Sequence, residues 1–314
     1  MEFRTKVEVD KPPFFISHSD KLMFAGSCFA DEIGRRFREF RYNALVNPFG
    51  VLFNPVSIAL AIKRMADSTP FDESVVTRHN DLYFSWMHSG LFSSYDKNLL
   101  LEDINNKLEV ASEHFRDSSV VLLTLGTAWV YRLKSTGEVV ANCHKESASS
   151  FDREFISPED VFNSLSGLIE MFRDKRWILT VSPVRHFKDG ARGNILSKSS
   201  LHLGVSQLER AFSNVSYFPA YEIVNDELRD YRFYATDMLH PSESAVNYIW
   251  ERFCESYIDP DESDLNMRIA RCNAMFNHRA QFPESSEFKK FAEQRERLSE
   301  SIDKEILKLS LKRL

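Results

Sequence analysis

The stretch that decides the fold is residues 21–37, which read Lys-Leu-Met-Phe-Ala-Gly-Ser-Cys-Phe-Ala-Asp-Glu-Ile-Gly-Arg-Arg-Phe. Its apolar run from Leu22 to Ala25 is short enough for a buried strand. Beyond Gly26 and Ser27 the pattern changes to helical spacing, typical of a helix with one apolar face. Apolar side chains then recur every four residues, at Phe29, Ile33 and Phe37. The sequence therefore predicts a strand that leads directly into a helix.

Ser27 falls where this helix is expected to begin, and that position has two interpretations. Serine often caps the first turn, where backbone N–H groups have no acceptor inside the helix. The same N–H groups and the helix dipole favour negative charge, so they would also stabilise an oxygen nucleophile and the oxyanion formed beside it. The local sequence leaves both interpretations open.

A second polar motif lies about two hundred residues further along the chain. Residues 234–242 read Tyr-Ala-Thr-Asp-Met-Leu-His-Pro-Ser, which sets Asp237 and His240 in a D-x-x-H-P arrangement. An imidazole that takes a proton and a carboxylate that orients the imidazole are what a serine nucleophile requires. Because Pro241 disfavours helical backbone at His240, we expect a loop there. The sequence predicts Ser27 as nucleophile, His240 as base and Asp237 as orienting group.

Length and composition exclude several classes of protein. The chain has 314 residues with 43% hydrophobic residues, enough for one large domain with additions or for two domains. Its net charge of −6 argues against nucleic acid as a partner. No apolar run approaches the ~20 residues that a membrane span needs. The N-terminal residues lack an apolar signal core, so we expect a cytoplasmic protein.

The four cysteines form no C-x-x-C pair, so the sequence predicts reduced thiols and no zinc site. Neither common glycine-rich nucleotide motif is present, and we expect no cofactor and no metal. Cys28 is expected to pack in the first turn of its helix rather than to react. The chain also lacks G-x-S-x-G, so a reactive Ser27 would not stand on an α/β-hydrolase elbow.

Apolar strands and amphipathic helices alternate along the chain. This order predicts a parallel sheet with helices on both faces. Strands are expected at 119–125, 177–181 and 215–218, and helices at 157–173, 195–212 and 242–257. Sites in such sheets lie beyond the carboxyl ends of the strands. Three candidate groups follow strands in this way: Ser27, Gly126-Thr127 and Arg185-His186.

Residues 67–98 are rich in aromatic side chains and show no helical period. Such a segment is either a functional loop or a satellite hydrophobic cluster, and the sequence leaves both open. On the first interpretation, the predicted substrate-binding residues are Trp86, His88, Asn142, His144, Arg185 and His186. Gly50, between two Asn-Pro turns, is either a turn residue or brings a backbone N–H close to the substrate.

Residues 26–30, Gly-Ser-Cys-Phe-Ala, resemble the motif that names the GSCFA family, a branch of the SGNH or GDSL-like hydrolases. Further matching segments are 125–129, 180–186, 226–234 and 237–241. The resemblance implies a three-layer, flavodoxin-like α/β fold with about five parallel strands. We expect this hydrolase domain to span residues 1–258, with a helical C-terminal extension at 259–314.

The resemblance also implies the catalytic roles of Ser27, Asp237 and His240. It implies an oxyanion hole made by the backbone N–H groups of Ser27 and Gly50. An asparagine that usually supplies a third donor is absent, and Thr127 or Asn142 would have to replace it. Loss of one such donor costs about 10²–10³ in rate, so the replacement matters.

These features predict a serine esterase acting on a small-molecule or glycan ester. An O-acylated carbohydrate is the preferred substrate, because aromatic side chains suit a sugar ring. Two alternatives stay open: a non-catalytic glycan-binding or scaffolding protein on the same fold, and an acyltransferase. The apolar stripe Leu298, Ile302 and Ile306 predicts a terminal helix that packs on the domain or forms a homo-oligomer.

Overall fold

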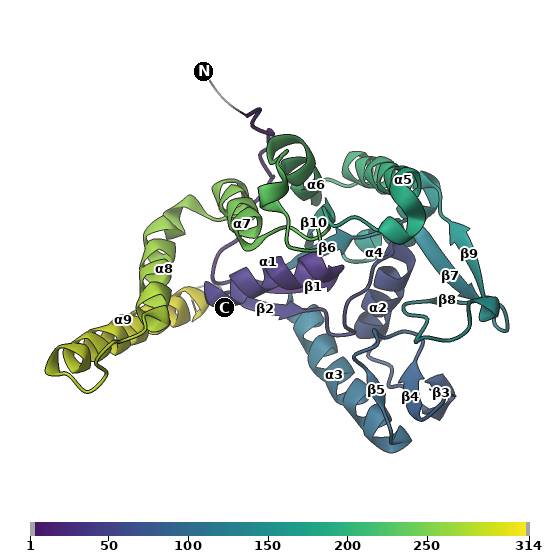
Figure 1. The fold of residues 1–314 in the computed structure, drawn as a ribbon, viewed down its shortest axis with the longest axis horizontal. Helices are drawn as coiled ribbons and strands as arrows, with labels where there is room; N and C mark the ends of the chain where they lie inside the picture. Colours follow the sequence, from purple (N-terminus) through teal and green to yellow (C-terminus); the bar gives the residue numbers. More distant parts are fainter. Residues whose placement is uncertain (1–3, 312–314) are drawn as a thin grey trace.

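A five-stranded parallel sheet forms the centre of the computed structural model, which describes residues 4–311 (Figure 1). The strands follow the order β11-β10-β6-β1-β2, and every neighbouring pair is parallel. Their bounds are β1 Lys21–Gly26, β2 Asn43–Val46, β6 Val120–Leu125, β10 Arg176–Val181 and β11 Val215–Tyr217. The predicted parallel sheet is confirmed.

Helices cover both faces of the sheet, because alternate residues of each strand point to opposite sides. Met23 of β1 packs into a core shared with α2, α3, α4 and α5. Phe24, the next residue, packs into a second core with α1 and α7. The bounds are α1 Cys28–Glu39, α2 Pro55–Asp67, α3 Lys97–Asp117, α4 Pro158–Met171, α5 Gly190–Ala211 and α7 Glu243–Tyr257. The three-layer α/β fold is therefore confirmed.

Two small antiparallel sheets are added to this framework. One lies inside the aromatic segment 67–98 and consists of β3 Val76–His79, β4 Leu82–Ser85 and β5 Ser93–Ser94. Strands of two to four residues are too short for an alternation of apolar and polar side chains to be visible in the sequence. The strands of this region could therefore not be predicted. The other consists of β7 Trp129–Leu133, β8 Val139–Val140 and β9 Phe151–Phe155, and β7 and β8 form an antiparallel hairpin.

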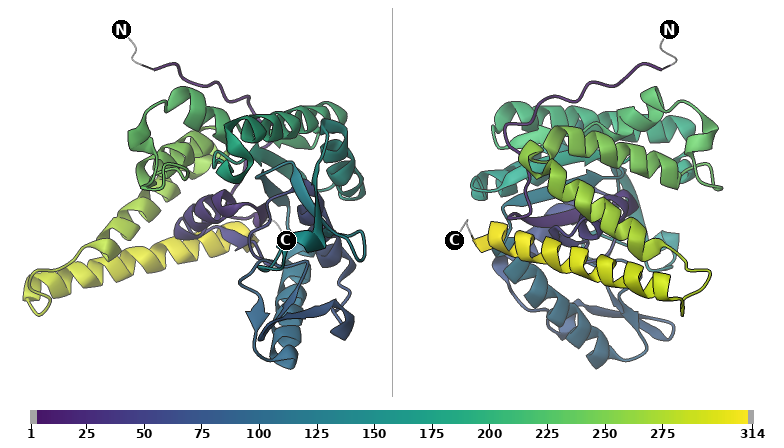
Figure 2. Two further views of the ribbon diagram at one scale, coloured as in Figure 1. Left: turned by 45° about the vertical axis from the view of Figure 1, so that its right-hand side comes forward. Right: turned by 90° about the vertical axis from the view of Figure 1, so that its left-hand side faces the viewer.

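Two C-terminal helices, α8 Ser263–Asn277 and α9 Ser286–Leu311, stand beside the main body on the side opposite β7 and β9 (Figures 1 and 2). Ile302 of α9 is fully buried against α8, and Leu298 and Ile306 pack beside it. The predicted apolar stripe therefore packs within the chain. The homo-oligomer and the domain boundary after residue 258 stay predictions.

The remaining elements are short helical turns. They are η1 Glu73–Val75, η2 Ala148–Ser150, η3 Phe187–Asp189, α6 Ala220–Glu222, the π-helical η4 Ile223–Glu227, η5 Tyr231–Phe233 and η6 Pro260–Glu262. Across residues 4–311, none of the helices has the length and apolarity that crossing a bilayer requires.

Gly26 ends β1 with φ at 148°, and a Cβ there would lie 2.3 Å from the backbone oxygen of Thr124. That oxygen accepts the N–H of Ser27 at 3.0 Å, which joins the start of α1 to β6. We expect Gly26→Ala to lower the free energy of unfolding by about 3 kcal/mol, measured by urea denaturation, because the backbone must move.

Gly167→Ala is the matched control. Gly167 lies inside α4 and a Cβ there would meet nothing within 4 Å. Alanine should raise the free energy of unfolding by about 0.5–1 kcal/mol at this position. Equal effects of the two substitutions would contradict the packing argument for Gly26.

Candidate active site

Ser27 is the N-cap of α1. Its backbone is extended, its Oγ accepts the N–H of Phe29 at 3.4 Å, and only 1% of the residue is exposed. Among the contacts of residues 4–311, its hydroxyl makes no hydrogen bond with His240. Ser27 is therefore a buried N-cap residue, as the capping interpretation predicts.

Cys28, the first residue of α1, faces His240 instead. Its Sγ lies 3.4 Å from His240 Nε2, and His240 Nδ1 lies 2.6 Å from Asp237 Oδ2. The side chains of His240 and Asp237 are 47% and 46% exposed, whereas Cys28 is half-buried. This differs from the sequence-based expectation, in which Cys28 only packs. The reason is that the first helical position points outward when the N-cap side chain turns back over the first turn.

The loop that carries His240 is held by its own backbone. Asp237 Oδ1 accepts the N–H groups of Leu239 at 2.9 Å and His240 at 3.0 Å. The N–H of Ala235 donates to the backbone oxygen of His240 at 2.7 Å. Met238, between the two polar residues, adopts a positive φ of 59°. The loop therefore fixes the carboxylate and the imidazole relative to each other.

The N–H groups of His240 and Leu239, followed by the His240 ring, lower the pKa of Asp237 to about 2. The carboxylate is therefore ionised at neutral pH and accepts a hydrogen bond from the Nδ1–H group of His240. A neutral His240 in that tautomer presents Nε2 as an acceptor toward Cys28.

Burial, and then the charge of Asp31, raise the pKa of the Cys28 thiol. The N–H groups of Phe29 and Cys28 and the charge of Lys198 act in the opposite direction. Because the first two effects prevail, Cys28 rests as a thiol and needs a base to become a thiolate. His240 is in position to be that base.

Lys198 of α5 is a buried lysine close to Cys28. It is 2% exposed, and its Nζ donates to the backbone oxygens of Gly126 and Ser182, both at 2.7 Å. Burial lowers its pKa to about 7. Lys198 is not among the site residues predicted from the sequence, although it shares the apolar face of its helix with Leu201 and Val205, which is a signal of burial.

The backbone N–H groups of the three residues predicted for the oxyanion hole each donate to a backbone oxygen elsewhere in the chain. Ser27 donates to Thr124 O at 3.0 Å, Gly50 to Asn47 O at 2.7 Å and Thr127 to Phe53 O at 2.9 Å. The Thr127 hydroxyl pairs with Ser197 Oγ at 3.1 Å. The N–H groups that face the Cys28 sulfur belong to Cys28 and Phe29, at the start of α1.

Four of the predicted substrate-binding residues contact one another instead of Cys28, Asp237 and His240. His144 stacks on Phe84 and lies 3.1 Å from the backbone oxygen of His88. Asn142 Oδ1 accepts the N–H of His144, and Trp86 lies 5.9 Å from the His144 ring. His88 is 1% exposed, with its ring stacked on Phe49 at 4.6 Å. These contacts fit the satellite-cluster interpretation of the aromatic segment.

His186 and Arg185 lie close to the triad. Burial, and then the charges of Lys198, His240 and Lys188, lower the pKa of His186 to about 4, so its ring is neutral at pH 7. Arg185 lines a groove together with Met238 and Leu239, the two residues between Asp237 and His240.

A different groove, of about 1350 Å³, lies between α2, β4 and the β7–β8 hairpin. Trp86 lines it, but Cys28, Asp237 and His240 do not. For residues 4–311, no group of three histidine, cysteine or acidic side chains is arranged to hold a metal ion.

Comparison with known protein families matches the GSCFA family over residues 21–253, a range that includes both Cys28 and the Asp237–His240 loop. No curated protein matches the chain. One solved structure, described as a candidate platelet activating factor from Streptococcus pneumonia, is similar at a TM-score of 0.36 and 10% identity. The alignment covers 75% of this chain and 83% of that one. A likeness of that size supports no argument about chemistry.

Burial lowers the pKa of His88 to about 3, so the folded protein excludes a proton that the unfolded chain binds below about pH 6.5. Its contribution to stability is complete above pH 6.5 and declines as the pH falls toward 3. Between pH 6.5 and pH 5 we expect His88 to account for a loss of about 2 kcal/mol in the free energy of unfolding. His88→Phe should remove that part of the slope in urea denaturation.

His278→Phe, at an exposed position, should keep the wild-type slope. An unchanged slope in His88→Phe would mean that the His88 ring is accessible to protons, as a substrate-binding residue would be.

Proposed function

The chain belongs to the GSCFA family, and from that membership and the geometry of the site we propose that it is a hydrolase of acyl compounds with Cys28 as nucleophile. His240 acts as the general base and Asp237 orients it. The observation that carries the proposal is the 3.4 Å separation between Cys28 Sγ and His240 Nε2. We also propose that the three-layer fold is that of the SGNH or GDSL-like hydrolases.

The reaction proceeds in two acyl transfers. His240 Nε2 takes the thiol proton, and the sulfur of Cys28 attacks the substrate carbonyl carbon. The N–H group of Cys28 and the N-terminal end of the α1 dipole stabilise the oxyanion of the tetrahedral intermediate. His240 then gives its proton to the leaving alcohol or thiol, and a thioester with Cys28 remains.

Water completes the cycle. His240 removes a proton from a water molecule, which attacks the thioester carbonyl. The carboxylic acid leaves, and the sulfur recovers its proton from His240. Asp237 remains ionised throughout and stabilises the imidazolium that forms twice per turnover.

The substrate class that this chemistry favours is an ester or thioester. An O-acylated carbohydrate has less support as the substrate, because Trp86, His88 and His144 of the aromatic segment and its neighbour pack on one another. A Ser27 nucleophile has less support than Cys28, because its hydroxyl is buried and engaged with Phe29.

Substitution of the two adjacent residues separates these nucleophiles. We expect Cys28→Ala to lower the hydrolysis of aryl acetates and aryl thioacetates at least about 10³-fold. Ser27→Ala should change turnover less than about 10-fold and lower the free energy of unfolding by about 1 kcal/mol, as loss of an N-cap does. Cys143→Ala, at another half-buried cysteine, is the control. The reverse pattern would assign the reaction to Ser27.

Alkylation tests the role of His240 without a substrate. Iodoacetamide should modify Cys28 at neutral pH, and His240→Ala should slow that modification at least about 10-fold, because the thiol loses its base. Mass spectrometry of the peptides reports Cys28 and Cys143 in the same sample. Equal slowing at Cys143 would indicate a general structural change instead of a lost base.

A further inference from the structure

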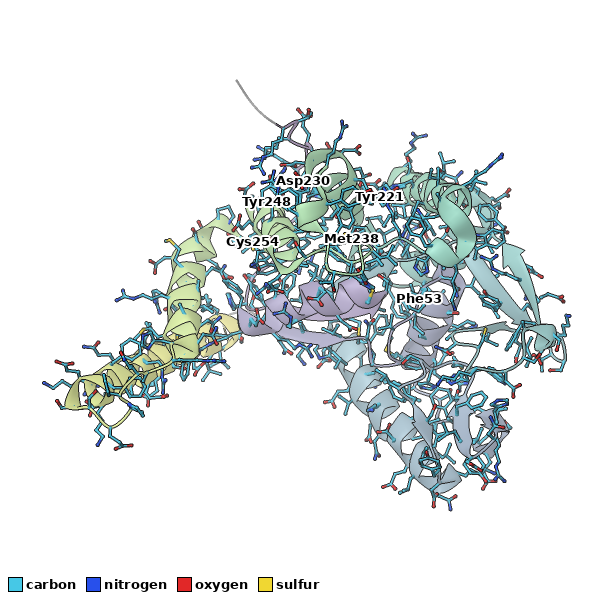
Figure 3. The ribbon with its side chains drawn as sticks, viewed as in Figure 1. Phe53, Tyr221, Asp230, Met238, Tyr248 and Cys254 are labelled. Carbon is cyan, nitrogen blue, oxygen red and sulfur yellow. The ribbon has the colours of Figure 1, made fainter. Side chains whose placement is uncertain are left out.

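A groove of about 450 Å³ adjoins the loop that carries Asp237 and His240. Met238 and Leu239 of that loop form part of its wall. The rest comes from the segment after β10, the turn η4 and the segment after η5, which supply Arg185, Asn225 and Tyr234 respectively. Figure 3 shows labelled side chains of this region, Tyr221, Asp230 and Met238, on segments that lie above α1 in that view. We call this feature the Arg185 groove.

Arg185 is held in a defined position. Its Nη2 donates to Asn225 Oδ1 at 2.8 Å, and Asn225 Nδ2 donates to the backbone oxygen of Tyr221 at 2.8 Å. The second bond fixes the amide so that its oxygen faces the guanidinium. Asn225 lies in the π-helical turn η4, and turns of this kind occur frequently at functional sites. The position of the guanidinium is therefore fixed by Asn225, which is itself held by the backbone.

The charge of Arg185 is not neutralised locally. Among residues 4–311, no carboxylate lies within ion-pair distance of it, and its side-chain partner is the neutral Asn225. The other charged residues of the groove have partners, since Arg229 lies 3.7 Å from Asp226 and Asp230 lies 3.1 Å from Arg232.

Two lysines also act near this end of the sheet. Lys198 and Lys188 both oppose protonation of His186, the residue next to Arg185. Arg185 itself opposes protonation of Lys198. A concentration of unpaired positive charge beside a reactive group attracts an anion.

We propose that the Arg185 groove binds a negatively charged arm of the substrate, a carboxylate or a phosphate, while the acyl carbonyl reaches Cys28. The guanidinium donates two N–H groups to the anion, and Tyr231 and Tyr234 pack along the arm. This inference rests on the proposed function, because it names the kind of ester or thioester that the site accepts.

A matched pair of substrates tests the preference. The pair is 4-acetoxybenzoate and its neutral analogue 4-acetoxybenzamide, which share a ring and an acetyl group. We expect kcat/KM to be about 10-fold or more higher for the anion. Arg185→Gln should bring the ratio of the two kcat/KM values close to 1, whereas Arg185→Lys should retain part of the preference for the anion.

Arg173→Gln is the control for charge, because Arg173 lies beyond α4, is 70% exposed and pairs with Glu170. It should leave both substrates unaffected. A wild-type enzyme without preference for the anion, or an Arg185→Gln variant that loses activity equally on both substrates, would overturn the inference.

Binding separates this inference from the proposed function. Calorimetry with 4-acetamidobenzoate, 4-acetamidophenyl phosphate and neutral 4-acetamidobenzamide needs no turnover. Binding of either anion that weakens at least about 10-fold in Arg185→Gln supports the groove, even if no ester is hydrolysed and the proposed function fails. Turnover without Arg185-dependent binding of either anion would sustain the hydrolase and reject the groove.

Discussion

The parallel pairing of β1 with β6 at Gly26 is the constraint on which the site depends. The backbone of Gly26 approaches Thr124 so closely that no side chain fits, and Thr124 O accepts the first N–H beyond the strand, that of Ser27. The chain must therefore leave the sheet at this residue and begin α1 there. The position of Cys28, one residue later, follows from this contact, as does the direction of the N–H groups around its sulfur.

This geometry places the neighbouring residues Ser27 and Cys28 in different environments. An N-cap side chain turns back toward the helix to satisfy a free N–H group, so Ser27 is buried by the role that it performs. The next side chain has no such role and can face outward. Whether it meets a base depends on the loop of Asp237 and His240, which arrives from the other end of the domain.

The charged groups around the site differ in how they are paired. The ionised carboxylate of Asp237 accepts a hydrogen bond from His240 and orients its imidazole. The buried Nζ of Lys198 joins the ends of β6 and β10, because it donates to a carbonyl group beyond each strand. A buried lysine is costly unless its donors are satisfied, and these bonds offset part of that cost. Arg185 lies on the open side with a neutral partner, so its charge remains available to a ligand.

The sequence by itself determined the layered α/β architecture, the entry of β1 into α1 and the local pairing of Asp237 with His240. Periodicity and short spacing carry this information, because residues three or four apart meet through backbone geometry alone. Only the tertiary structure decided that Cys28, not Ser27, lies against His240, and that the N–H groups of Gly50 and Thr127 are engaged within the fold. It also revealed the burial of Lys198 and the support of Arg185 by Asn225. These contacts join residues far apart in the chain, and the packing of helices on the sheet sets which side chain faces which.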